Sequence, residues 1–172
     1  CLFAALAHPM IIMVLGQKWS YCAVLMVPIC FTMMLYPIHA INLNLLQVTG
    51  RSDLFLKLEI IKTILGVTIL CFSIHFGLLF MCYSGIVTSI ICLVINTYYT
   101  GKLINVGFIR QMIDLSGSLI TSLLMFALVY MLYLFIENNI LILCVGLVIG
   151  IVFYIGVAYL FEFDEITYLK TI

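Results

Sequence analysis

Charged residues are scarce in this sequence: 8% of its 172 residues are Asp, Glu, Lys or Arg, where a soluble domain has about 25%. They are missing altogether from positions 63 to 101, a run of 39 residues. One helix of that length would reach about 58 Å, against a hydrocarbon core of about 30 Å. Because 66% of the chain is hydrophobic, this composition argues against a soluble protein. It predicts a membrane protein whose chain turns back within the run, at His75 to Gly77.

The sequence also lacks the patterns typical of metal sites, nucleic acid binding and catalytic domains. The seven cysteines show no close paired spacing of the kind that zinc or iron-sulfur sites need, so we interpret them as small apolar residues. The formal net charge is zero and no basic stripe carries interleaved aromatics, which argues against a nucleic acid partner. All predicted loops are too short to hold a catalytic domain. We therefore expect a protein that is not an enzyme, with no catalytic residue, no metal and no cofactor.

Apolar segments predict an all-α fold, a polytopic transmembrane bundle of about six helices. The second segment is long for one crossing, and Pro28 and Pro37 predict that it kinks. The first is short for a crossing and the chain opens on Cys1, so we expect the C-terminal part of a longer protein. The predicted segments are 1–15, 19–49, 54–74, 78–101, 115–136 and 140–161.

Positive charge predicts the orientation. Cytoplasmic loops carry an excess of Lys and Arg. If the segments alternate across the membrane, Lys18 stands alone on one side and six basic residues lie on the other. The C-terminus is then predicted to be cytoplasmic, together with Arg51, Lys57, Lys62, Lys102, Arg110 and Lys170.

Polar side chains recur along one face of three predicted helices. In segment 19–49 the steps of four, four, three and four from Tyr36 through Ala40, Asn44 and Gln47 to Arg51 keep these residues on one narrow face. A polar group is costly in hydrocarbon, so such faces should meet protein or a water-filled cavity. The predicted substrate path is formed by Asn44, Gln47, Arg51, Glu59, Lys62, Asn96 and Tyr99.

Most of these positions also have a simpler interpretation. Glu59 and Lys62 are spaced to form a local ion pair near the interface. His39 borders the polar face of its helix and is a candidate proton relay, or else a hydrogen-bonded packing residue. Gly146 and Gly150 have the spacing of a close helix contact, which involves no chemistry.

Several stretches resemble a known family. They are residues 16–19 (GQKW), 36–44 (YPIHAINLN), 50–59 (GRSDLFLKLE), 76–77 (FG) and 89–99, which ends in NTYY. Together they resemble the C-terminal half of bacterial lipopolysaccharide and polysaccharide flippases, members of the multidrug, oligosaccharidyl-lipid and polysaccharide exporter superfamily. The resemblance covers residues 15 to 110, and beyond them rests on hydropathy and placement.

The resemblance implies a two-lobe transporter in the bacterial inner (cytoplasmic) membrane. Such a transporter moves lipid-linked oligosaccharide for lipopolysaccharide, O-antigen or capsular polysaccharide synthesis by alternating access. Residues 1–101 would hold the last four helices of the second lobe, the first of them truncated. Residues 102–114 would form a cytoplasmic connector, and 115–172 two additional membrane helices with a short cytoplasmic tail. The implied partners are membrane lipids, an oligosaccharide on a polyprenyl pyrophosphate, and an N-terminal lobe outside this sequence.

Three alternatives remain open. A cation-coupled multidrug exporter of the same superfamily would favour a deeply buried acidic residue, whereas Glu59 lies near the predicted interface. A polysaccharide polymerase or ligase would present a large external loop, which these short connections do not provide. A purely structural or assembly subunit is opposed only by the polar faces.

Overall fold

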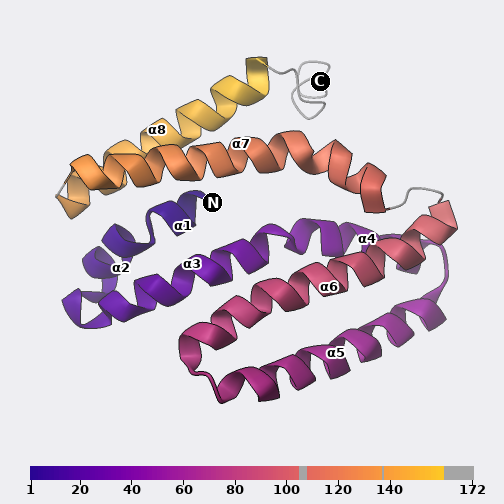
Figure 1. The fold of residues 1–172 in the computed structure, drawn as a ribbon. Helices are drawn as coiled ribbons and strands as arrows, with labels where there is room; N and C mark the ends of the chain where they lie inside the picture. The colour runs from indigo at the N-terminus through magenta and orange to yellow at the C-terminus, as the bar shows by residue number, and fades with distance from the viewer. Residues whose placement is uncertain (105–107, 137, 161–172) are drawn as a thin grey trace. The chain divides into compact units, whose positions relative to one another are not determined.

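A computed structural model describes residues 1–104, 108–136 and 138–160, and within these ranges it contains helices and no strand. The predicted all-α class is confirmed (Figure 1). The helices are α1 (Leu2–Ala5), α2 (Ala7–Leu15), α3 (Ser20–Met34), α4 (Tyr36–Val48), α5 (Ser52–Ile74), α6 (Leu78–Ile104), α7 (Phe108–Phe135) and α8 (Asn139–Leu160), with a 3-10 turn at Gln17–Trp19.

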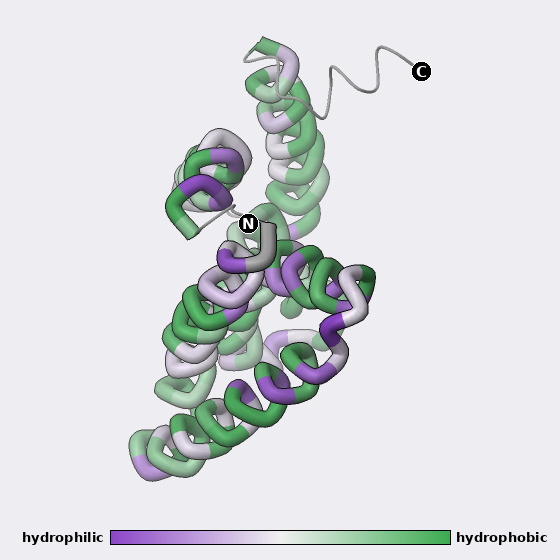
Figure 2. The backbone as a smooth tube through the Cα atoms, turned by 90° about the vertical axis from the view of Figure 1, so that its right-hand side faces the viewer, coloured by the Kyte–Doolittle hydropathy of each residue, from purple (hydrophilic) through white to green (hydrophobic). Residues whose placement is uncertain are grey.

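Four helical stretches are long and apolar enough to cross a membrane. Figure 2 shows hydrophobic residues along most of the backbone tube, interrupted by isolated hydrophilic positions. Many large aliphatic and aromatic side chains are exposed on these helices, as expected where lipid rather than water surrounds the protein. The chain is therefore a helical membrane protein. The four stretches are Gln17–Val48, Leu78–Lys102, Phe108–Tyr133 and Asn139–Leu160.

Helix α5, predicted as a further span, differs from these four in composition. Every 18-residue window within it contains Lys57, Glu59 and Lys62, which is more charge than the four apolar stretches carry. Its 23 residues still reach about 34 Å, and it lies alongside α6 (Figure 1). The prediction of about six membrane helices is therefore only approximate. Within the described residues there are four apolar spans and a fifth, more polar helix packed against one of them.

The predicted turn and kink are both present. Helix α5 ends at Ile74, and the turn before α6 contains Gly77 with φ of 95°, a left-handed conformation that glycine adopts without steric cost. Segment 19–49 is divided between α3 and α4 at Leu35, two residues before Pro37, whose missing N–H cannot continue the hydrogen-bond ladder. Pro28 stays inside α3, so only one of the two prolines separates helices.

The connector predicted at 102–114 is largely helical. Helix α6 continues to Ile104 and α7 begins at Phe108. Charge at Lys102 or Arg110 marks where a helix can leave hydrocarbon, but it gives the backbone no reason to stop being helical. Residues 105–107 of the connector lie outside the described part of the chain. So do residues 161–172, which include Lys170, the end of the last predicted helix and the predicted tail.

The chain forms two compact units. The central unit is Pro28–Met112, and the terminal unit combines Cys1–Val27 with Ile113–Ile172. In the terminal unit the first apolar segment packs with α7 and α8. The predicted division into lobe helices, connector and additional helices stays a prediction. Within the terminal unit the buried apolar cluster is formed by Ala5, Leu6, Met125, Val129 and Ile142.

Candidate functional site

The main polar cluster of the central unit is organised around His39 on α4. Its Nε2 lies 3.1 Å from Ser89 Oγ and its Nδ1 lies 3.1 Å from Asn96 Nδ2, so both ring nitrogens have a partner on α6. Ser89 and Asn96 are seven residues apart, which places them on one face of α6 two turns from each other. The imidazole therefore bridges two helices of the bundle.

Asn96 is the most deeply buried member of this cluster. Its exposed fraction is 0%, and its Oδ1 has no hydrogen-bond partner among the described residues. A buried amide oxygen without a partner is unfavourable, since a polar group withdrawn from water needs a replacement hydrogen bond. The Asn96 oxygen could therefore gain a hydrogen bond if the side-chain amide turned over or if a water molecule were bound beside it.

A second polar contact joins α4 to the first turns of α7. Asn42 Nδ2 donates to Gln111 Oε1 at 2.9 Å, and Gln111 Nε2 donates back to Asn42 Oδ1 at 3.2 Å. Asn42 is only 2% exposed and also donates to the Ile38 carbonyl. Reciprocal amide pairs of this kind hold membrane helices together. Neither Asn42 nor Gln111 was among the residues predicted from the sequence.

The charged pair predicted on α5 is formed. Lys62 Nζ donates to Glu59 Oε1 three residues earlier on the helix. The Lys62 side chain is 13% exposed and that of Glu59 is 41% exposed, so the ammonium is the more enclosed member. Both charges act electrostatically on His39 and on Cys92 of α6. The pair therefore belongs to the surroundings of the His39 cluster.

The predicted substrate path is divided in the structure. Asn96 contacts His39, while Asn44 and Gln47 are exposed on α4 and do not join that cluster. Asn42 and Asn44 are two residues apart, which is about 200° around a helix, so the buried and exposed amides point in different directions. Tyr99 is partly buried, with its ring against that of its neighbour Tyr98 at a centroid distance of 5.5 Å.

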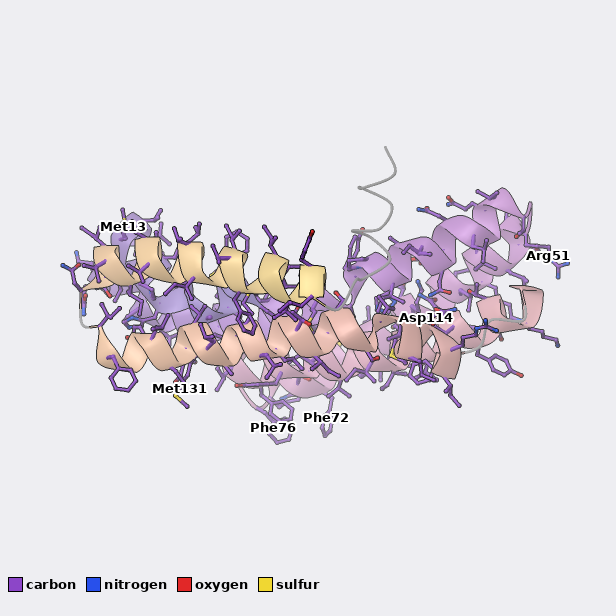
Figure 3. The ribbon with its side chains drawn as sticks, turned by 90° about the horizontal axis from the view of Figure 1, so that it is seen from above. Met13, Arg51, Phe72, Phe76, Asp114 and Met131 are labelled. Atoms are coloured by element: carbon purple, nitrogen blue, oxygen red, sulfur yellow. The ribbon has the colours of Figure 1, made fainter. Side chains whose placement is uncertain are left out.

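An exposed polar stripe runs along α4. It is formed by Tyr36, Asn44 and Gln47 of the helix and by Arg51, which follows the end of the helix. All four are exposed, Tyr36 to 63%. Arg51 is at the outer end of α4 with its side chain directed away from the helices (Figure 3). Its Nε is 3.9 Å from Asp53 Oδ1, a long and exposed ion pair that leaves the guanidinium open to other partners.

A groove lies within the central unit between α3, α5 and α6. Its volume is about 310 Å³, and small or hydroxyl side chains form most of its wall. Ser89 belongs both to this wall and to the His39 cluster, so the groove reaches that cluster. The lining residues are Thr32, Gly66, Leu70, Met81, Ser84, Gly85, Thr88 and Ser89.

The described residues offer hydrogen bonds and charge but no cluster of metal ligands. No group of three His, Cys, Asp or Glu side chains lies close enough to hold an ion in that part of the chain. In the terminal unit, His8 Nδ1 lies 3.0 Å from the Tyr133 hydroxyl, a contact between α2 and α7.

Comparison of the chain with protein-family models, with curated proteins and with solved structures gave no match.

Proposed function

We propose that this chain forms part of a membrane transporter that moves a lipid-linked oligosaccharide across the bacterial inner membrane by alternating access. The observation that carries the proposal is the exposed α4 stripe within an apolar membrane stretch. Lipid cannot hydrate the amides of Asn44 and Gln47, so they require water, protein or a polar substrate. A path for a polar solute, completed by further membrane helices, meets that requirement.

The chemistry of the stripe suits a glycan with an anionic head group. Each amide of Asn44 and Gln47 offers two donors and one acceptor oxygen, the set that binds neighbouring sugar hydroxyls. Arg51 presents a guanidinium at the end of the stripe, suited to the phosphates of a polyprenyl pyrophosphate. Resemblance of residues 36–44 and 50–59 to the flippases supports the same assignment. No bond is made or broken in such transport, so the chain would not act as an enzyme.

The proposal is tested by removing the amides of the stripe. Asn44→Leu and Gln47→Leu should lower export severalfold per molecule, since a net hydrogen bond contributes about 0.5–1.5 kcal/mol. The measurement is surface polysaccharide per unit of folded protein, in cells whose surface polysaccharide depends on this protein. Ile41→Leu, at an exposed apolar position of α4 outside the stripe, is the matched control. Unchanged export per molecule in both amide variants would mean that the stripe does not bind substrate.

The proposed orientation places Arg51 on the cytoplasmic side. In a variant lacking the seven native cysteines, a single cysteine at Gln17 or Asn138 should react with an impermeant thiol reagent added outside. A cysteine at Ser52 should react only after the membrane is permeabilised. Gln17 begins the Gln17–Val48 stretch and Ser52 follows its end, so they lie on opposite sides if it crosses once. Labelling of Ser52 from outside would reverse the orientation and remove the cytoplasmic role of Arg51.

A further inference from the structure

We propose that His39 is a reversible proton-binding site inside the central unit, reached by water through the groove whose wall includes Ser89. The site goes beyond the proposed transport function and does not depend on which solute is carried. Three observations place it. Each ring nitrogen of His39 has a partner that can donate or accept, and Ser89 belongs to the groove wall. The buried Asn96 oxygen has no hydrogen-bond partner in the part of the chain that the structure describes.

The two partners of the ring allow it to be neutral or charged. A serine hydroxyl can donate or accept, and an amide can present either its oxygen or its NH₂. In the arrangement with Asn96 Nδ2 donating to Nδ1, the neutral imidazole carries its hydrogen on Nε2 and donates to Ser89. An imidazolium donates from both nitrogens, so Asn96 must then present Oδ1 to Nδ1.

The unpartnered oxygen of Asn96 permits this exchange. Oδ1 has no hydrogen bond among the described residues, so turning the amide breaks none on its far side. The two contacts permit either tautomer of the neutral ring. The tautomer with its hydrogen on Nδ1 fits the turned amide, because Nδ1–H then donates to Asn96 Oδ1 and Nε2 accepts from the Ser89 hydroxyl. A proton from a hydronium ion in the groove then passes to Ser89 Oγ while the serine proton moves to Nε2. The products are an imidazolium, an intact serine and a water molecule.

The groove supplies a route for that proton. The groove leaves about 310 Å³, a volume that would hold several waters at roughly 30 Å³ each, although most of the surface it exposes is apolar and its polar atoms are few. The hydroxyls of Thr32, Ser84 and Thr88 donate to backbone carbonyls of their own helices, so their oxygens remain acceptors for water. Ser89 connects this wall to the imidazole at 3.1 Å.

Charges around the site link its protonation to helix packing. From α5, Lys62 repels an imidazolium and Glu59 attracts it. The same two charges act on the Cys92 thiol of α6. Helix α3 contains no Asp, Glu, Lys, Arg or His, and Arg110 of the first turn of α7 is exposed. Protonation of His39 therefore places two positive groups against one carboxylate where α4, α5 and α6 meet. The contact between these helices should respond to pH.

Nuclear magnetic resonance of the full chain in lipid nanodiscs, with ¹⁵N-labelled histidine, tests the site directly. His8→Gln and His75→Gln assign the two other histidine signals. We expect the His39 ring nitrogens to change from the neutral to the charged pattern as the pH is lowered from about 8 to about 4, with the Asn96 side-chain amide signal moving over the same range. An imidazole that stays neutral throughout this range, with helical content unchanged, would show that His39 is a packing residue.

A second measurement tests the route of the proton. Gly66→Leu should fill the groove, because a Cβ at Gly66 meets only Thr88 Cγ2 at 4.0 Å and needs no rearrangement. Exchange of the His39 ring N–H with solvent should slow severalfold in this variant, while Gly156→Leu in the terminal unit leaves it unchanged. Equal exchange rates in Gly66→Leu and the native protein would overturn the groove as the route. Neither measurement depends on transport, so failure here is distinct from failure of the proposed function.

Discussion

Replacing Gly146 and Gly150 by leucine should destabilise the terminal unit strongly. A Cβ at Gly146 would lie 2.9 Å from Leu6 Cδ2 and 3.2 Å from Val129 Cγ1. A Cβ at Gly150 would lie 2.5 Å from Leu2 Cδ1 and 3.4 Å from Val129 Cγ2. Such overpacking costs about 1–3 kcal/mol per site, so the double variant should lose much of the stability of a marginal protein. Unfolding in mixed detergent micelles measures the loss.

Gly156 provides the control within the same helix. Among the described residues, no atom beyond the local helix backbone lies within 4 Å of a Cβ built at Gly156. Gly156→Leu should therefore keep or slightly raise stability, because leucine favours a helix more than glycine does. Partial recovery is expected when Gly150→Ala is combined with Leu2→Ala, which removes the closest atom. Equal losses at positions 150 and 156 would mean that glycine is needed for a reason other than the close approach to Leu2 and Val129.

Removing Glu59 should cost more stability than removing Glu59 and Lys62 together. Glu59→Leu leaves the enclosed Lys62 ammonium without its carboxylate, whereas the double change to leucine suits a bilayer. Breaking a buried pair costs about 3–5 kcal/mol, and the 41% exposure of Glu59 brings our expectation down to about 2 kcal/mol. The double-mutant cycle, followed by unfolding in micelles, isolates the coupling between the two side chains.

The charge swap separates stability from function for the same pair. Glu59→Lys with Lys62→Glu keeps opposite charges three residues apart, so the folded yield should match the native protein. If Lys62 binds an anionic head group, the swapped protein should fold and yet export poorly. Full export by the swapped protein would remove Lys62 from the substrate path. In the double-mutant cycle, purely additive losses of stability would show that the two side chains are not coupled.

The spans and their interruptions were largely predictable. Long uncharged stretches have few alternatives to a membrane helix, because hydrocarbon leaves backbone polar groups no partner except the helix itself. Proline and glycine then mark interruptions through their own backbone restrictions, as at Pro37 and Gly77. Charge was a poorer guide to helix boundaries. Helix α6 continues past Lys102, and helix α7 begins before Arg110.

The polar cluster was only partly predictable. Helical spacing identified Asn96 and singled out His39, because polar residues are conspicuous in an apolar helix. It could not show that Asn42 is buried, since the residues that share its face, Ile38 and Leu46, are apolar. In a water-soluble protein, an apolar helix face of this kind would indicate a position in the core. In a membrane protein, an apolar face can equally contact lipid. Gln111 carried even less signal, because it lies in the predicted connector.

The sequence by itself determined that this chain is a helical membrane protein and where most of its helices turn or break. Those features depend on local backbone chemistry and on the cost of charge in hydrocarbon, which each segment expresses alone. Only the tertiary structure decided that the first apolar segment packs with α7 and α8, and that His39 bonds Ser89 and Asn96 while Asn44 stays exposed. Between helices in lipid there is little hydrophobic driving force, so close packing and pairing of polar groups select the partners, and both depend on residues far apart in the chain.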